Sequence, residues 1–306
     1  MSHGGAGPAG VDPWEHRDGT LGLGLAWGAQ ALSGTEGQQV TPALPLKRVL
    51  VLSYLNVRNF GDRLGFHVIN GLLPANALVT HAALNFAYPP TEDYDLLILG
   101  SGHSLNAAAI EKPELQRLIR AIPHSIGIFG TQYPNQYRNM ADPGLFPDLL
   151  DRMTTWWARY ETDVADYGGG RSNVRHLGDW LISAFPLTPP RVDRSLVIAA
   201  DTREQELALD RTIQQIQVYR RVFSARIHPL LCALTSAEEV AYKEQRESPD
   251  PACESGKFRA LLLDIFGRTF PEDEYFRVDR AAVLRYKMMV EANMAELRSQ
   301  ICALLA

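Results

Sequence analysis

The chain has 306 residues and a mass of 34.0 kDa, which is long enough for two α/β units with cores of their own. Its 30 Lys and Arg against 35 Asp and Glu give a formal net charge of -5. This balance excludes the overall positive field that is typical of proteins binding nucleic acid or an anionic membrane, so any anion site must be local.

Targeting and metal signals are lacking in the sequence. No apolar run approaches the roughly 20 residues of a membrane span, and no basic start followed by an apolar stretch marks a signal peptide, so we expect a cytoplasmic protein. Cys232, Cys253 and Cys302 are odd in number and widely spaced, which favours reduced thiols over a disulfide framework or a metal knuckle. No His, Cys or Asp spacing matches a metal-ligand pattern.

Helix and strand patterns begin after residues 1–45, whose Gly, Ala and Pro content predicts a flexible extension. The segment RVLVLSYL predicts a strand and LGFHVINGLL an amphipathic helix. The pattern continues with strands at 77–84, 93–102 and 125–134, a helix at 113–122, and helix and strand character over 145–161. We expect a first domain over residues 46–190, ending at a proline cluster.

A second, shorter set of elements follows over residues 191–277. Strands are predicted at 194–201 and 238–242, a helix at 203–217, and a strand running into a helix over 219–234. Residues 278–306 predict one long amphipathic helix. The fold class is therefore α/β, with parallel sheets covered on both faces, and ligand sites are expected at the carboxyl ends of the strands.

Four loops at predicted strand ends carry glycines and polar side chains. They are Asn59-Phe60-Gly61-Asp62, Gly100-Ser101-Gly102-His103-Ser104, Gly130-Thr131-Gln132 and Ser224-Ala225-Arg226-Ile227-His228. Ordinary turn chemistry explains any single glycine equally well, and Asn59 or Asp62 could simply cap a helix. Leu105 stands where a dinucleotide fingerprint needs its third glycine, and no Walker lysine follows, which disfavours both nucleotide motifs.

The charged candidates each have a plain structural alternative. Arg226 and His228 lie where a strand passes into an apolar helix, and a guanidinium at a helix N-terminus suits a phosphate or carboxylate. His228 could instead only cap or pack, and Arg159 could form an ion pair with Glu161 or Asp163. Lys257 could be a solvated surface lysine, and Lys243 is an equally placed rival.

Taken in order, these segments resemble the polysaccharide pyruvyl transferase family. Asn59-Phe60-Gly61-Asp62 is similar to its Asn-x-Gly-Asp turn, and Arg226-Ile227-His228 to its late Arg-Leu-His-like element. Between them, DLLILGSGHSL, WARYETD and HLGDWLISAFP resemble further family segments, and the resemblance spans residues 49–267. It implies two Rossmann-like domains facing a cleft, similar to the glycosyltransferase B architecture. This sequence departs from the family pattern in its abbreviated second domain and in the diluted glycine run after the second-motif strand.

The resemblance also implies a reaction, the transfer of pyruvate from phosphoenolpyruvate to a sugar or glycan acceptor as a ketal, without a cofactor. His228 would be the catalytic acid and Asp62 the acceptor-side base. The implied substrate-binding residues are Arg159, Arg226, Lys257, Asn59, Gly61, Gly100, Ser101, Gly102, Gly130 and Thr131.

The acceptor and the oligomeric state stay open in the sequence. A lipid-linked acceptor would require peripheral contact with a membrane, and no nucleic acid partner is expected. Two alternatives also stay open. One is a nucleotide-sugar-dependent glycosyltransferase of the same architecture, with its diphosphate at the Arg226 helix, and the other is a catalytically silent relative that binds or scaffolds.

Overall fold

The computed structural model describes residues 45–54, 59–86, 90, 93–100, 105–132, 137, 140–200, 208–246 and 254–306. The described residues lie within one compact unit, Leu44–Ala306. The extension predicted over residues 1–45 falls almost wholly outside the described residues, as do Ser101 and Gly102.

Six parallel strands form the first sheet, in the order β2-β1-β3-β4-β5-β6. Their bounds are β1 (Lys47–Ser53), β2 (Ala77–Ala83), β3 (Leu96–Leu99), β4 (His124–Gly127), β5 (Thr155–Ala158) and β6 (Val174–His176). The order changes direction between β1 and β3. In open α/β sheets, such a switch point leaves a crevice at the carboxyl ends of the strands where ligands bind.

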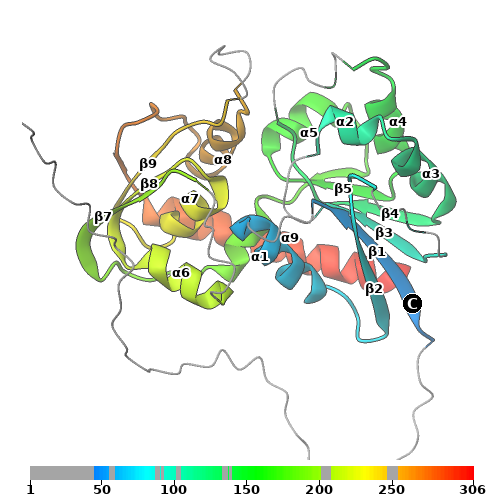
Figure 1. The fold of residues 1–306 in the computed structure, drawn as a ribbon, viewed down its shortest axis with the longest axis horizontal. Helices are drawn as coiled ribbons and strands as arrows, with labels where there is room; N and C mark the ends of the chain where they lie inside the picture. Colours follow the sequence, from blue (N-terminus) through cyan, green and yellow to red (C-terminus); the bar gives the residue numbers. More distant parts are fainter. Residues whose placement is uncertain are drawn as a thin grey trace, which may run out of the picture. The chain divides into compact units, whose positions relative to one another are not determined.

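Alternate side chains of β1 and β3 enter two different hydrophobic clusters. Val49 and Val51 belong to one cluster and Leu50 and Leu52 to the other, as the period of two along a strand requires. The second cluster is covered by α2 (Ala107–Ile110), α3 (Pro113–Ala121), α4 (Leu145–Arg152) and α5 (Glu161–Tyr167), which Figure 1 shows beside this sheet. The helix α1 (Phe60–Asn70) contributes Phe60 and Leu64 to the first cluster.

The second sheet has four strands in the order β10-β9-β8-β7. The strands β7 (Val192–Ile198), β8 (Tyr219–Ser224) and β9 (Glu239–Tyr242) are parallel, and β10 (Phe276–Arg277) pairs antiparallel with β9. The helices of this part are α6 (Leu209–Gln217), α7 (Ile227–Leu234) and α8 (Lys257–Phe266). Every residue of α7 is buried, which matches a sequence that is apolar except for His228.

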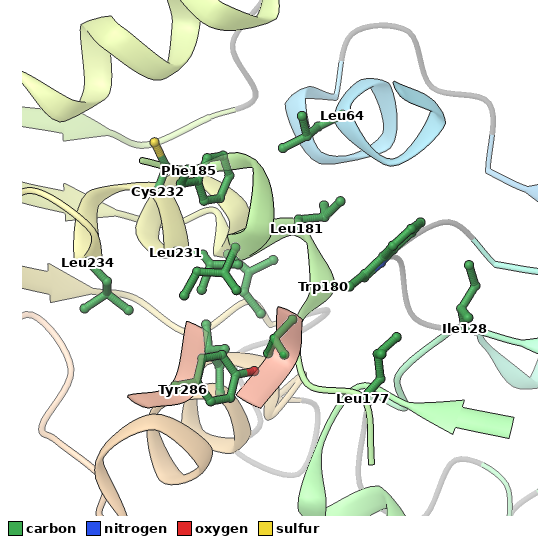
Figure 2. Packing of buried hydrophobic residues seen from close by; sticks show 14 of the residues in the cluster. Leu64, Ile128, Leu177, Trp180, Leu181, Phe185, Leu231, Cys232, Leu234 and Tyr286 are labelled. Atoms are coloured by element: carbon green, nitrogen blue, oxygen red, sulfur yellow. The ribbon is translucent and has the colours of Figure 1, made fainter. Parts of the chain in front are cut away.

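One hydrophobic cluster contains residues from both halves of the described chain. Figure 2 shows Leu64 of α1, Leu181 of the 3₁₀ helix η1 (Trp180–Ala184), Leu231 of α7 and Tyr286 of α9 (Arg280–Leu304) among its members. The helix α9 buries residues at three- and four-residue spacing along one stripe, namely Ala282, Val283, Tyr286, Val290, Leu297 and Ile301.

The predicted α/β class, with a smaller second sheet and a long C-terminal helix, is confirmed. One expectation is wrong, because the strand at residues 239–242 is not the last and the second sheet is mixed rather than parallel. The pattern also missed α2, α5, β6, η1 and β10, which have two to seven residues. Elements this short contain too few residues to show a period.

Candidate functional site

The carboxyl edge of the first sheet gathers the polar turns that the sequence singles out. Gly100 directly follows β3, Gly130 and Thr131 follow β4, and Arg159 is the first residue after β5. Since all six strands are parallel, these turns share one edge with the turn that begins α1. The edge therefore collects groups that are far apart in the sequence.

The turn before α1 is held by a helix cap. Asn59 is the N-cap residue, and its Oδ1 accepts a hydrogen bond from the backbone N–H of Asp62 at 3.1 Å. The capping alternative thus applies to Asn59. Asp62 lies in the first turn of the helix, where its carboxylate is buried to 8% exposure and faces the favourable end of the helix dipole.

The imidazole ring of His228 packs directly against the backbone of Gly61. A Cβ atom added to Gly61 would overlap Nδ1, Cε1 and Cγ of the ring, so only glycine allows this approach. His228 is the second residue of α7 and is 7% exposed. The structure therefore joins the Asn-Phe-Gly-Asp turn to the Arg-Ile-His element through a contact between Gly61 and His228, which are 167 positions apart in the chain.

Asp179 lies between Arg159 and His228. Its Oδ2 is 3.7 Å from Nε of Arg159 and 3.7 Å from Nε2 of His228, and all three side chains are buried. The other carboxylate oxygen accepts from the N–H of Leu181 and so caps η1. Burial raises the pKa of Asp179, although the charge of Arg159 opposes the rise.

Arg159 is a buried cation with donors to spare. Burial lowers the pKa of its guanidinium, but the charge of Asp179, the Tyr160 hydroxyl and the charge of Asp163 together outweigh burial, so the net shift is upward and the group stays charged. Within the described part of the chain, its Nε and Nη2 atoms have no hydrogen-bond partner, and its Nη1 donates to the Tyr160 hydroxyl at 3.4 Å. Such donors can bind an anion without losing protein contacts.

Asp179 replaces the partners that the sequence suggested for Arg159. Neither Glu161 nor Asp163 is its nearest carboxylate, since Asp163 instead accepts from Thr131 Oγ1 at 2.5 Å and from the Thr131 and Tyr160 amides. Burial raises the pKa of Asp163 to about 7 against these hydrogen bonds. Thr131 is therefore tied to the start of α5.

Two further glycines allow close packing at this edge. A Cβ on Gly130 would lie 3.0 Å from Arg159 Cβ and from Tyr160 Cε2, so the glycine lets the Arg159 stem pass close to the backbone. Gly100 has a φ of 98° and faces the carbonyl oxygen of Ile128. Both glycines thus serve the packing of the edge, whether or not a ligand contacts them.

Lys257 lies within electrostatic range of the same group of charges. Burial, together with the charges of Arg159 and Arg226, lowers the pKa of Lys257 to about 8, against the opposing charges of Glu244 and Asp62. Lys257 begins α8, and Arg226 is the half-buried N-cap residue of α7. Three cations from three separate segments therefore meet near Asp62 and His228.

The rival lysine lies elsewhere. The Lys243 side chain is 55% exposed, and its Nζ is 4.0 Å from a carboxylate oxygen of Asp273, which is also exposed. A surface pair of this kind is worth little.

Asp179 is the residue that the sequence analysis left out of the site. It appeared only as the acid of the HLGDWLISAFP segment, in a Gly-Asp turn. The signal in the sequence was the glycine directly before it, Gly178. In the structure this glycine has a φ of 84°, a conformation that favours glycine, in the tight turn that follows β6. The pairing of Asp179 with Arg159 and His228 could not be seen in that local pattern.

Neither a metal centre nor a membrane span is present in the described part of the chain. Among those residues, no group of three or more His, Cys, Asp or Glu side chains is arranged to hold a metal ion. No described helix has both the length and the apolar character to cross a bilayer.

No protein-family model and no curated protein matches this chain. Among solved structures, an α-glucosyltransferase in complex with UDP is similar over 85% of this chain and 95% of its own, with 8% identity and a TM-score of 0.36. A carbohydrate transporter from Acidothermus cellulolyticus 11B, in complex with myo-inositol, is similar over 82% of this chain and 100% of its own, with 12% identity and a TM-score of 0.30. Likenesses this loose assign no function.

Proposed function

We propose that this protein is a pyruvyl transferase, which moves pyruvate from phosphoenolpyruvate to a sugar or glycan acceptor as a cyclic ketal. One observation carries the proposal. Arg159, Arg226 and Lys257 come from three distant segments, Lys257 lies within electrostatic range of both arginines and of Asp62, and Gly61, which precedes Asp62, contacts His228. The segments that supply Arg159, Arg226, Gly61 and His228 are those in which the sequence resembles the polysaccharide pyruvyl transferases.

The donor explains why three cations would be needed. Phosphoenolpyruvate carries a carboxylate and a phosphate on one three-carbon unit, and guanidinium groups bind both by paired hydrogen bonds. Arg159 supports this role because two of its buried nitrogens have no hydrogen-bond partner among the described residues. Arg226 and Lys257 add positive charge at the N-termini of α7 and α8, where the helix dipoles also favour an anion.

The reaction consumes two acceptor hydroxyls and releases inorganic phosphate. The methylene carbon of the donor takes up one proton, the central carbon forms bonds to both hydroxyl oxygens, and its bond to the phosphate oxygen breaks. The two hydroxyls lose two protons in total. One balances the proton added to the methylene carbon, and the other is released with the phosphate.

His228 is the proposed acid for this reaction and Asp62 the proposed base. The carboxylate of Asp179 lies 3.7 Å from His228 Nε2, on the ring that would deliver the proton. Asp62 directly follows the glycine on which the ring rests, so it is suitably placed to accept a proton from an acceptor hydroxyl. Asn59 holds this turn, and the glycine loops after β3 and β4 are the proposed backbone lining of the substrates.

The test measures phosphate release from phosphoenolpyruvate in the presence of candidate acceptors. We expect Arg226→Ala and His228→Ala to lower the rate by at least about 100-fold, because one removes donor charge and the other the acid. Lys243→Ala is the matched control, since it removes an exposed cation of the second sheet, and it should keep the wild-type rate. Full turnover by both site variants, with intact folding by circular dichroism, would refute the assignment.

Binding separates this proposal from the two alternatives. A ligand that binds the folded state raises the unfolding temperature by mass action. We expect phosphoenolpyruvate to stabilise the wild type, and uridine or guanosine diphosphate to have no effect. The opposite result would favour a nucleotide-sugar-dependent glycosyltransferase, and no stabilisation by any of these anions would favour a catalytically silent relative.

A further inference from the structure

The helix α8 begins with backbone donors that have no acceptor inside the helix. The N–H groups of Phe258 and Arg259 lie in its first turn, where intrahelical partners do not exist. Both donate to one oxygen of a distant side chain, Oε2 of Glu244, at 3.1 and 3.3 Å. The cap is thus supplied by a carboxylate 14 and 15 positions away in sequence.

Glu244 follows the carboxyl end of β9, and hydrogen bonds hold both its side chain and its backbone in place. Its other oxygen, Oε1, accepts from the Ser255 hydroxyl at 2.5 Å, and its backbone N–H donates to Glu272 at 3.1 Å. The residue is 4% exposed. The residue before α8 is Gly256, which has a φ of 70° and no side chain for capping, and from the same turn the Ser255 hydroxyl accepts, among the described residues, only from the N–H of Lys257, at 3.5 Å.

We propose that Glu244 is a positioning residue. It caps α8 from the end of β9, and the cap keeps Lys257 within electrostatic range of Arg159 and Arg226. Lys257 is the first residue of the helix, directly before the two capped N–H groups. The direction of the helix start therefore fixes where the lysine side chain emerges. The inference rests on the proposed donor site for its functional meaning, but the contacts that carry it do not depend on that function.

The charge of Glu244 adds an electrostatic role to the geometric one. The charged groups around Lys257 are Arg159 and Arg226, which disfavour its ammonium form, and Glu244 and Asp62, which favour it. Around Glu244 itself lie the carboxylate of Glu272 and the hydroxyl of Tyr242. Burial raises the pKa of Glu244, and the hydrogen bonds from Ser255 and from the start of α8 oppose this rise.

The first experiment measures Lys257 directly and needs no activity. Competitive acetylation of the full chain by acetic anhydride, followed by peptide mass spectrometry over pH 6 to 10, gives the midpoint at which the amine becomes reactive. In Glu244→Gln we expect this midpoint to fall by about half a pH unit or more, because a negative charge that favours the ammonium is gone. An unchanged midpoint and rate would overturn the proposal.

The matched control is Glu254→Gln. Glu254 is a neighbouring carboxylate that pairs with the side chains of Arg246 and Arg259. Its substitution removes the same charge and leaves both bonds from Glu244 to the start of α8 in place. We expect the Lys257 midpoint of this variant to equal that of the wild type, and an equal shift in both variants would also overturn the proposal.

A second measurement uses the wild type alone, in case Glu244→Gln does not fold. Amides in the first turn of a helix exchange quickly with solvent unless an outside group accepts their hydrogens. We expect the amides of Phe258 and Arg259 to exchange at least about tenfold more slowly than exposed amides, and exchange at the exposed rate would contradict the cap.

Affinity for the donor separates this inference from the proposed function. If both hold, Glu244→Gln weakens the stabilisation by phosphoenolpyruvate, whereas Glu254→Gln does not. A shifted Lys257 midpoint in a protein that never binds phosphoenolpyruvate would confirm the positioning role and refute the donor site.

Discussion

At the scale of single residues, the contact between Gly61 and His228 is the tightest constraint on the candidate site. The imidazole ring occupies the space that a side chain at position 61 would need. The ring is also 3.7 Å from the Asp179 carboxylate, so it has little room to move in either direction. A single methyl group at position 61 is therefore a sharp probe of the site.

We expect Gly61→Ala to lower phosphate release by about 100-fold, since a displacement of about 1 Å at a catalytic group can cost that much. The added Cβ must also push on a packed side chain, which costs about 1–3 kcal/mol of unfolding free energy. Gly71→Ala, at the other end of α1, is the control, because its Cβ would lie 3.3 Å from the Val68 carbonyl oxygen and its φ is −71°. Equal activity of the two variants would contradict a precise role for the ring position.

At the scale of elements, the buried acid Asp163 lies in the first turn of α5 and hydrogen-bonds to the loop after β4. Asp163 accepts hydrogen bonds from Thr131 and from the Tyr160 amide, and burial raises its pKa from 3.8 to about 7. The unfolded chain releases this proton near pH 4, whereas the folded protein keeps it until about pH 7. The folded state therefore binds more protons between these values, and stability falls as the pH rises through them.

We expect Asp163→Asn to remove this fall, because the amide has no proton to lose. Urea unfolding from pH 5 to pH 7.5 should show the free energy of the variant rising relative to the wild type, by up to about 1.4 kcal/mol per pH unit. Asp166→Asn, on the exposed side of the same helix, should follow the wild-type profile. Parallel profiles for wild type and Asp163→Asn would show that the acid is ionised in the folded protein.

The helix α9 holds the segment that carries Asp179. The Tyr286 hydroxyl accepts from the backbone N–H of Asp179 at 2.6 Å, Lys287 donates to the carbonyls of Ile182 and Ser183, and Asn293 donates to that of His176. These bonds reach from the C-terminal helix to both ends of the turn that follows β6. The helix thus supports the site without contributing a side chain to the cation cluster.

We expect Tyr286→Phe to cost about 1–3 kcal/mol of unfolding free energy, because it leaves the buried Asp179 amide without its acceptor. Phosphate release should also fall, since Asp179 faces both Arg159 and His228. Tyr275→Phe makes the same change on a ring that is 37% exposed, and it should alter neither property. The idea fails if both variants unfold at the wild-type urea concentration.

At the scale of the whole molecule, one of the two hydrophobic clusters contains residues from both sheets. The cluster contains strand residues of both sheets, such as Val49 and Val222, and it includes Leu181 of the connecting segment. Each half therefore buries apolar surface that it would expose alone, at about 25 cal/mol per Å². The two halves should depend on each other for stability.

We expect a single unfolding transition in calorimetry for this part of the chain, and no stable fold for residues 44–190 or 191–306 expressed separately. Leu181→Ala should lower the temperature of that one transition rather than split it, at a cost of about 2–5 kcal/mol. Two resolved transitions in the wild type would show that the halves are independent domains.

Local pattern in the sequence was sufficient to predict the alternation of strands and helices and the position of the glycine turns. A buried parallel strand is a short apolar run, which located β1, and in β3 and β4 the run also ends in glycine. The cap at Asn59 and the apolar stripe of α9 are also local features, since each depends on residues within a few turns.

Only the tertiary structure decided which polar residues meet. The sequence could not rank Lys257 above Lys243, because only packing leaves Lys257 half-buried within range of Arg159 and Arg226 while Lys243 stays exposed. Nor could it pair Asp179 with Arg159 and His228, which lie 20 and 49 positions away in sequence. Contacts of this range depend on how sheets and helices pack, and a local pattern of residue types holds no record of that packing.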